Sequence, residues 1–353
     1  MNTFQLSNIP PPLVGKTGWP WTVMSDGKET HGDEKCDLPR ITIITPSYNQ
    51  GQYIEETIRS VLLQDYYNLE YIVIDGGSTD LTLQVLKKYD RYITWISEPD
   101  EGQTDAINKG LKRATGEIVA YLNSDDIYEP GTLNRIAEMF LRYETIAMIY
   151  GDVTHIDTNS RIIEHHKTGK VNLGKYLLAG EFYLPQPSVF FRKNVIDSVG
   201  YFDKTLHLAM DYDYWLKILL KFKTCYVPET FSCARIYPNA KSSALDYRYF
   251  DEMLSIYTRI FANNPRLEPL RKNVFGYVYF SGALTFLRRR YFHKAVKNFK
   301  IALKYDLRYL VHPYLYWELV QFIIGEKNAR KLRPCVKKMV NFLVTIPNYN
   351  IIN

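Results

Sequence analysis

The residues of this chain that could most readily do chemistry follow an apolar run. Residues 118–122 read Ile-Val-Ala-Tyr-Leu, a pattern typical of a buried strand, and Asn-Ser-Asp-Asp follows directly at 123–126. Adjacent carboxylates at the end of a buried strand repel each other and are costly to desolvate, and a bound cation would remove that cost. Their hard oxygen atoms suit Mn2+ or Mg2+, ions that often hold a substrate diphosphate. The alternative is an acidic loop that caps a helix beginning near Pro130.

Polar turns also follow three other apolar runs in the first half of the chain. After the first, Tyr48 offers a flat face and Asn49 can read an amide edge. After the second, Asp75 can accept a hydrogen bond from an N–H group or a ribose hydroxyl. After the third, Gln103 and Asp105 are free to face a ligand. Neither G-x-G-x-x-G nor G-K-S/T occurs here, so neither a dinucleotide-binding fold nor a P-loop is indicated.

A further pair of carboxylates lies in Met-Asp-Tyr-Asp-Tyr-Trp at 210–215, where an amphipathic helix is predicted over 212–220. On a helix, Asp211 and Asp213 point to different faces, so the two are not interchangeable. Asp211, with Trp215 four residues further on, could be a general base held where a sugar hydroxyl arrives. An acid in the first turn could equally be a partner of the helix dipole.

These residues are positioned by alternating strands and helices. Strands are predicted at 41–45, 71–74, 92–96 and 118–122, with helices between them at 54–63, 81–89 and 104–113. This alternation predicts a parallel sheet with right-handed crossovers, in which ligands bind beyond the carboxyl ends of the strands. All the polar turns named above fall at those ends. Further strands are predicted at 147–150 and 189–192, and only helices from about 247 onward.

The length of 353 residues predicts one large α/β domain with an appendage. We expect an extended arm over 1–39, which is rich in Pro and Gly, a catalytic domain over 40–245 and an all-α region over 246–353. In the last region, large and small residues alternate at the spacing of one tetratricopeptide-like hairpin, although ordinary helix packing would give the same spacing. The residues concerned are Tyr279, Ala283, Phe286, Ala295, Phe299 and Ala302.

Composition limits the partners and the compartment. A formal charge of +6 is modest for this length, and we expect no nucleic-acid partner. Four cysteines without a C-x-x-C spacing, no signal-peptide pattern and no apolar run of about 18 residues lead us to expect a cytoplasmic protein. The apolar stretch 315–324, followed by the basic stretch 327–338, could rest on the anionic inner face of a membrane. Docking of this tail on its own catalytic domain is the alternative.

Taken together, six segments resemble the family 2 glycosyltransferases of the GT-A fold, over roughly residues 40–245. They occur in the family's order, and their joint occurrence is far more specific than any one of them. The segments are Thr-Pro-Ser-Tyr-Asn, Asp-Gly-Gly-Ser-Thr-Asp, Gly-Gln-Thr-Asp-Ala-Ile-Asn-Lys-Gly, Ala-Thr-Gly-Glu-Ile, Leu-Asn-Ser-Asp-Asp and Met-Asp-Tyr-Asp-Tyr-Trp. The resemblance implies a mixed, mostly parallel sheet flanked by helices, and transfer of a sugar with inversion from a nucleotide-diphosphate-sugar donor to a glycan or lipid-linked acceptor. Polysaccharide, lipopolysaccharide or other glycoconjugate biosynthesis is the expected context.

The resemblance also implies roles for residues, which we carry over by position. Asp211 would be the catalytic base, and Asp125 and Asp126 would hold Mn2+ or Mg2+. The donor-binding residues would be Thr45, Pro46, Tyr48, Asn49, Asp75, Gln103, Asp105, Asn123, Asp125 and Arg235, with Asp75 reading the base and Arg235 closing over the phosphates. Gln186, Pro187, Ser188 and Trp215 would shape the acceptor side.

The chain departs from the family pattern at four positions. Asn123 replaces the first Asp of the metal motif, and Met210 replaces a Glu that often precedes the base. Tyr237 stands where many relatives carry a His, and Ile107 where many carry a phosphate-binding Arg. Two other classes of protein remain to be weighed. A catalytically inactive nucleotide-binding scaffold, with a tail that recruits a partner, would not need the intact Asp125, Asp126 and Asp211. A nucleotidyltransferase usually needs a basic Gly-rich loop near the first strand, and none follows Ile44.

Overall fold

The computed structural model describes residues 6–25, 38–179, 184–238 and 248–325. The chain divides into two compact units. The first comprises residues 1–171 and 183–243, and the second comprises residues 172–182 and 244–353. The second unit therefore takes a short segment from the middle of the range predicted for the catalytic domain. Within the described part of the chain, none of the helices combines the length and the hydropathy that crossing a bilayer requires.

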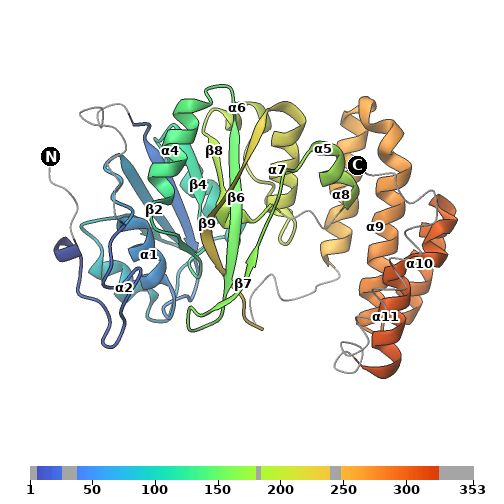
Figure 1. The fold of residues 1–353 in the computed structure, drawn as a ribbon, viewed down its shortest axis with the longest axis horizontal. Helices are drawn as coiled ribbons and strands as arrows, with labels where there is room; N and C mark the ends of the chain where they lie inside the picture. The colour runs from blue at the N-terminus through green and yellow to red at the C-terminus, as the bar shows by residue number, and fades with distance from the viewer. Residues whose placement is uncertain (1–5, 26–37, 180–183, 239–247, 326–353) are drawn as a thin grey trace. The chain divides into compact units, whose positions relative to one another are not determined.

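The first unit is built on a mixed sheet with the strand order β3-β2-β1-β4-β8-β6-β9-β5 (Figure 1). Its first half is parallel, as the sequence pattern predicts, and consists of β1 (Ile41–Ser47), β2 (Leu69–Asp75), β3 (Thr94–Ser97) and β4 (Ile118–Tyr121). In the other half, β8 (Val189–Arg192) runs antiparallel to β4 and to β6 (Met148–Ile156), while β9 (Thr224–Arg235) runs parallel to β6. Two strands add antiparallel pairs: β5 (Ile127–Tyr128) to β9, and β7 (Ile162–His166) to β6.

The register of the parallel half brings its carboxyl ends level. Ser47 of β1 lies opposite Asp75 of β2, and Asp75 lies opposite Ser97 of β3. On the other side of β1, Ile44 lies opposite Tyr121 of β4. The turns that leave these four strands therefore emerge along one edge of the sheet.

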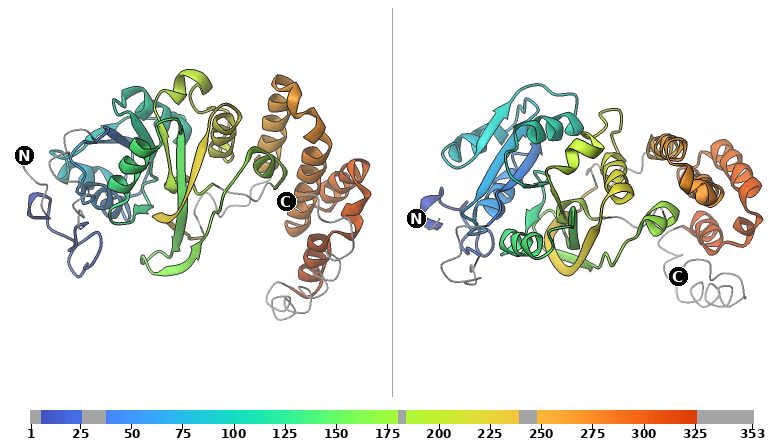
Figure 2. Two further views of the ribbon diagram at one scale, coloured as in Figure 1. Left: turned by 45° about the horizontal axis from the view of Figure 1, so that its top comes forward. Right: turned by 90° about the horizontal axis from the view of Figure 1, so that it is seen from above.

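Helices cover both faces of this sheet, and the alternation of the strand residues decides which face each side chain joins (Figure 2). Ile41, Ile43 and Ala120 belong to the large core, which is closed by α1 (Ile54–Leu62), α2 (Thr82–Lys88) and α4 (Thr132–Arg142). The opposite face packs against α3 (Gln103–Arg113) and α7 (Met210–Lys221), with α6 (Val195–Val199) beside α7. A Cβ added at Gly110 would lie 2.4 Å from the Ile44 side chain, so glycine there permits α3 to lie close to β1.

The N-terminal arm is packed onto this unit by a buried arginine that sequence analysis did not single out. Arg59 of α1 is fully buried. Its guanidinium donates to the carbonyl oxygens of Pro10 at 2.8 Å, Pro20 at 3.0 Å and Trp21 at 2.7 Å. The arm, which begins with the short helix η1 (Leu6–Asn8), is thereby tied to the core through its backbone.

The second unit is helical. Its helices are α5 (Leu173–Ala179), α8 (Arg248–Asn263), η4 (Pro265–Leu267), α9 (Glu268–Arg288), α10 (Phe292–Tyr305), η5 (Leu307–Val311) and α11 (Pro313–Ile324). α9 is central, because α5, α8, α10 and α11 all contact it. Ala283, Phe286, Ala295 and Ala302 are buried in the α9–α10 hairpin, as the large-and-small spacing predicts. The basic stretch 327–338 lies outside the described residues.

Candidate active site

Three segments meet at the carboxyl edge of the parallel half-sheet, and side-chain contacts link them. Gln103, at the start of α3, donates through Nε2 to Asn123 Oδ1 at 2.7 Å. The next residue, Thr104, donates through Oγ1 to the sulfur of Met210 at 2.7 Å. The first turn of α7, which carries Asp211, and the turn that carries Asp125 and Asp126 are therefore both linked to the start of α3. The sequence stretches 103–105, 123–126 and 210–211 meet at one place.

The Asp125–Asp126 turn is largely buried and held from several sides. Asp126 is buried, and its Oδ1 accepts from the backbone N–H of Arg235 at 2.9 Å. Its Oδ2 accepts from Asn123 Nδ2 at 3.3 Å. Asp125 is half-buried, and its Oδ2 accepts from the Tyr237 hydroxyl at 2.8 Å. Tyr237, which departs from the family pattern, thus contacts one of the two predicted metal ligands.

The electrostatics of this turn favour a cation. Burial raises the pKa of Asp125 above its ordinary value, although the Tyr237 hydrogen bond acts in the opposite direction. Burial and the neighbouring charge of Asp125 raise the pKa of Asp126 well above its ordinary value. Both shifts express the cost of two adjacent negative charges away from water, which a divalent ion would offset. The donor set of hard carboxylate oxygens fits Mn2+ or Mg2+.

The protein supplies only part of a coordination shell. Among the residues that the structure describes, no group of three or more His, Cys, Asp or Glu side chains could hold a metal ion. Mg2+ is usually held by one or two carboxylates together with substrate phosphates and water. As predicted metal ligands, Asp125 and Asp126 would supply two carboxylates of such a shell, and a diphosphate would complete it.

Arg235 lies behind this turn, with its guanidinium buried. Nη2 forms an ion pair with Glu56 Oε2 at 3.0 Å, and Nε donates to the carbonyl oxygen of Asp125 at 2.8 Å. Nη1 donates to the carbonyl oxygen of Asp157 and to Ser160 Oγ. In this arrangement the guanidinium holds the turn in place from within the protein. Its expected closure over donor phosphates stays a prediction, and would require these contacts to be exchanged.

The first two loops of the predicted donor side are joined by Asn49. Its backbone N–H donates to Ser78 Oγ at 2.7 Å, and its Oδ1 accepts from the Thr79 N–H at 2.9 Å. Asn49 has a φ of 52°, a left-handed conformation that asparagine tolerates better than most residues. Beside it, Tyr48 is 61% exposed and presents its ring to solvent. Tyr48 is therefore available for stacking on a planar group.

Three other predicted donor-binding residues are less exposed than Tyr48, namely Thr45, Pro46 and Asp75. Thr45 is fully buried and shares a hydrogen bond with the Tyr71 hydroxyl at 3.1 Å, while Pro46 pairs with Ile74 in the sheet. Asp75 is fully buried as well. Its two oxygens accept from the Ser78 hydroxyl and the Ser97 hydroxyl, and from the backbone N–H groups of 77 and 78. Here Asp75 shapes the loop that would face a base, and direct readout of the base stays a prediction.

On the predicted acceptor side, the amide side chain of Gln186 connects to Asn123, which precedes the Asp125–Asp126 turn. Gln186, in the short helix η3 (Gln186–Ser188), accepts from Asn123 Nδ2 at 3.0 Å and donates to the carbonyl oxygen of Tyr121 at 2.5 Å. Pro187 is buried beside it, and Ser188 Oγ donates to the carbonyl oxygen of Asp152. Trp215 is also buried, stacked on Tyr121 with ring centroids 6.5 Å apart. Ser188 and Trp215 are therefore buried supports of the predicted acceptor side.

The carboxylates of α7 are separated as the helical spacing predicts. Asp213 is fully buried and forms an ion pair with Lys217 Nζ at 2.6 Å, so its role is structural. Asp211 is half-buried in the first turn, where Oδ1 accepts from the Tyr212 N–H at 2.8 Å. Asp105, on α3, forms ion pairs with Lys204 at 3.0 Å and with Lys109 at 3.4 Å. Asp213 and Asp105 are thus paired with lysines, and Asp211 directly follows Met210, whose sulfur accepts from Thr104.

Sequence reasoning did not single out Glu56, which sits in the first turn of α1. Its Oε2 pairs with Arg235, and its Oε1 accepts from Ser160 Oγ at 2.7 Å. No motif marks it. The only available signal was two adjacent acids, Glu55 and Glu56, on a helix that reads as core-facing. Ile107, at the position of an Arg in many relatives, is fully buried and contributes no charge.

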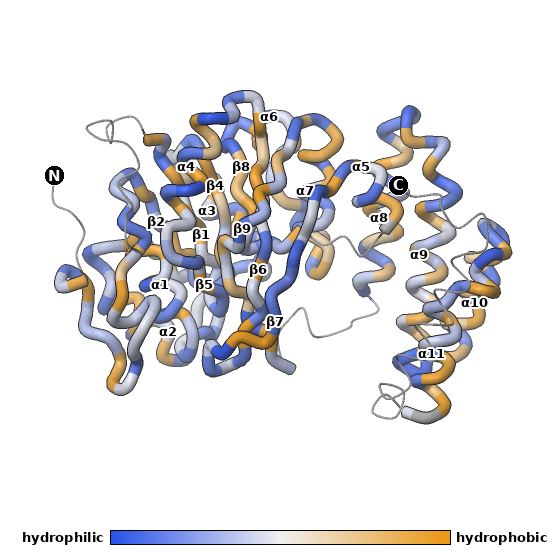
Figure 3. The backbone as a smooth tube through the Cα atoms, in the orientation of Figure 1, coloured by the Kyte–Doolittle hydropathy of each residue, from blue (hydrophilic) through white to orange (hydrophobic). Residues whose placement is uncertain are grey.

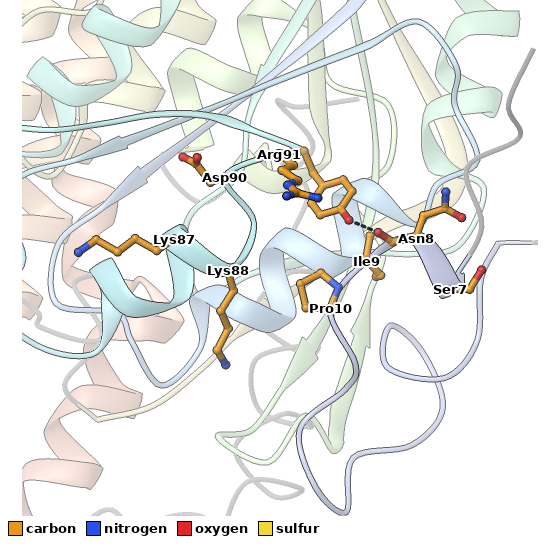
Figure 4. Close-up of a pocket in the computed structure, with 9 residues that line it drawn as sticks. Ser7, Asn8, Ile9, Pro10, Lys87, Lys88, Asp90 and Arg91 are labelled. Atoms are coloured by element: carbon orange, nitrogen blue, oxygen red, sulfur yellow. Dashed lines mark hydrogen bonds between the residues drawn. The ribbon is translucent and has the colours of Figure 1, made fainter.

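A separate pocket of about 480 Å³ lies between the arm and the C-terminal end of α2 (Figure 4). It is lined by Ser7, Asn8, Ile9, Pro10, Lys87, Lys88, Asp90, Arg91 and Tyr92, none of which is a predicted site residue. Lys87 and Lys88 point in different directions in Figure 4, and Lys88 pairs with Glu55 at 3.4 Å. These cations do not converge on a common point.

The chain is similar to known glycosyltransferases over part of its length. The family model described as glycosyl transferase family 2 matches residues 42–200. An uncharacterized glycosyltransferase of Rickettsia typhi is 29% identical over 51% of this chain and 59% of its own length. A PGL/p-HBAD biosynthesis glycosyltransferase of Mycobacterium bovis is 29% identical over 50% of this chain and 68% of its own length. The chain thus spans little more than half the length of the first of these relatives.

Solved structures show the same fold. Staphylococcus aureus TarS, residues 1–349 in complex with UDP-GlcNAc, has a TM-score of 0.54 at 19% identity, covering 74% of this chain and 90% of that one. A mannosyltransferase of Pyrobaculum calidifontis in complex with GDP-Man and Mn2+ has a TM-score of 0.54 at 18% identity, covering 89% and 90%. The first unit is a GT-A domain, which confirms the predicted fold class. Over residues 42–200 the chain is similar to glycosyl transferase family 2.

Proposed function

We propose that this protein is a family 2 glycosyltransferase, which moves a hexosyl or N-acetylhexosaminyl group from a nucleotide-diphosphate sugar to an acceptor hydroxyl, with inversion at the anomeric carbon. The observation that carries the proposal is the convergence at 103–105, 123–126 and 210–211. It brings a half-buried carboxylate, Asp211, to a paired-carboxylate turn that suits a diphosphate-bound cation. The two structural neighbours were solved in complex with the nucleotide sugars UDP-GlcNAc and GDP-Man, which supports this class of donor.

Each residue then has a task. Tyr48 and the loop shaped by Asp75 would receive the nucleoside, and Gln103 and Asn123 line the path toward the diphosphate. Asp125 and Asp126 would hold Mn2+ or Mg2+, which would neutralise negative charge on the departing diphosphate.

Asp211 would accept the proton of the acceptor hydroxyl as that oxygen attacks the anomeric carbon. Because one displacement from the face opposite the leaving group inverts the centre, a single carboxylate base suffices. The catalytically inactive scaffold is not favoured, since Asp125, Asp126 and Asp211 are all present and gathered. A glycan or lipid-linked acceptor, in polysaccharide or other glycoconjugate biosynthesis, completes the proposal.

The test begins with a panel of nucleotide sugars, screened by thermal shift with Mn2+ present. The donor that stabilises the protein is then used in transfer assays with and without EDTA, and proton NMR of the product reads the anomeric configuration. Asp211→Asn should lower turnover by a factor of about 10² to 10⁴ and leave donor affinity nearly unchanged, as loss of a general base would. Retention of configuration, or collapse of donor binding in Asp211→Asn, would overturn the assignment. Asp213→Asn serves as the matched control on the same helix.

A further inference from the structure

The helical unit has a surface on which basic and apolar side chains lie side by side. Residues 288–305 contain seven Lys and Arg residues and no Asp or Glu. Three of them, Lys297, Lys300 and Lys304, are exposed along α10, and none forms an ion pair with a described residue. Positions 297, 300 and 304 are three and four residues apart, so they share one face of the helix. The exposed face of α10 is therefore strongly positive.

An apolar stripe borders this positive face. Phe292 and Val296 of α10 are 49% and 54% exposed. The stripe continues on α11, because the rings of Phe292 and Phe322 lie 5.5 Å apart, edge to face. Next to Phe322, Ile323 is 75% exposed. Figure 3 shows apolar and hydrophilic stretches following each other along both helices. Exposed apolar side chains that contact one another across two helices indicate an interaction site.

We propose that this α10/α11 face, defined by Lys297, Lys300, Lys304, Phe292, Val296, Leu319, Phe322 and Ile323, docks onto the surface of an anionic lipid membrane. Such a surface matches both halves of the face: its headgroups attract the lysines, and the boundary of its acyl chains takes up the apolar stripe. The inference goes beyond the proposed function and does not depend on it, because it concerns the other unit and a binding equilibrium rather than turnover.

Two other occupants fit the face less well. In a symmetric pair of copies, the same patch meets itself, so the three lysines of one copy would approach those of the other. Like charges so placed would oppose association. Nucleic acid would satisfy the lysines but not aliphatic groups such as Val296, Leu319 and Ile323, because protein–nucleic acid interfaces are mostly polar and positively charged. A membrane surface satisfies both kinds of side chain at once.

The test is flotation of the full chain with vesicles of phosphatidylglycerol and phosphatidylcholine, compared with vesicles of phosphatidylcholine alone. We expect binding to the anionic vesicles that weakens as salt is added. The triple variant K297E/K300E/K304E should lose on the order of a hundredfold in partition coefficient, since each basic residue near an anionic surface contributes about a factor of five. The variant K87E/R91E/K223E changes the net charge equally on the first unit, and should bind as the parent chain does.

A second variant addresses the apolar stripe. Ile323→Asn alters a side chain that is three-quarters exposed, so the fold should tolerate it. It should weaken binding to anionic vesicles even at low salt. Equal binding to neutral and anionic vesicles, or equal loss in the two charge-reversal variants, would overturn the proposal. So would dimerisation in size-exclusion chromatography that Ile323→Asn abolishes, or binding of RNA that competes with vesicles and is insensitive to Ile323→Asn.

Discussion

The ion pair between Glu56 and Arg235 offers a sharp test of how the Asp125–Asp126 turn is held. Its two side chains are 7% and 0% exposed, and Oε2 lies 3.0 Å from Nη2. Glu56→Gln keeps the shape of the side chain and removes its charge, which leaves a buried guanidinium without its anion. Breaking a buried pair in this way costs about 3–5 kcal/mol of unfolding free energy. We expect about 3 kcal/mol, because Asp125, Asp157 and Ser160 still accept from Arg235.

The measurement is urea unfolding followed by tryptophan fluorescence. Four of the five tryptophans, at 19, 21, 95 and 215, lie in the first unit, so the signal reports mainly on that unit. The matched control is Glu229→Gln. Glu229 pairs with Arg135 at 2.7 Å, but the side chains are 44% and 37% exposed. An exposed pair contributes under about 1 kcal/mol, so the control should shift the midpoint only slightly.

Equal losses in Glu56→Gln and Glu229→Gln would refute the reasoning, because burial would then not distinguish the two pairs. A double-mutant cycle with Arg235→Gln adds a second check. The Glu56 and Arg235 substitutions should be strongly non-additive, since each removes the same pair, whereas their effects would add if the two side chains stabilised the protein independently. Glu56→Gln should also weaken Mn2+-dependent donor binding, because Arg235 holds both Asp125 and Asp126 through hydrogen bonds.

Two further predictions concern carboxylates with different tasks. Asp126→Asn should weaken donor binding in the presence of Mn2+ by at least about tenfold, since a metal ligand is lost, and should leave donor binding in EDTA unchanged. Calorimetry with and without the ion measures both affinities. An unaltered Mn2+ titration would contradict the metal assignment. Asp213→Asn should lower the unfolding free energy by about 3 kcal/mol, because the fully buried Asp213 pairs with Lys217. The protein that remains folded should retain its turnover. A turnover reduced as far as in Asp211→Asn would reverse the roles of the two acids.

The parallel half of the sheet could be predicted from local patterns. Each of its four strands is an apolar run followed by Gly, Pro, Asn or Asp, and each is followed by a helix of matching periodicity. The strand β9, which carries Arg235, was not predicted. Its sequence Thr-Cys-Tyr-Val-Pro-Glu-Thr-Phe-Ser-Cys-Ala-Arg mixes polar, charged and apolar residues, and its interior Pro argues against a strand. The bulged register between β6 and β9 accommodates this segment, which only tertiary pairing reveals.

The sequence by itself determined which chemical groups this protein brings to one edge of its sheet. The spacing of the strands and turns dictates that Asp75, Gln103, Asp125 and their neighbours follow strand ends, and parallel strands bring those ends together. Only the tertiary structure decided which acids are already engaged. Asp213 is neutralised by Lys217 and Glu56 by Arg235, whereas Asp125 and Asp126 share one buried turn with raised pKa values. The physical reason is that desolvation and ion pairing depend on which segments pack against a carboxylate, and those segments lie up to 179 residues apart in the chain.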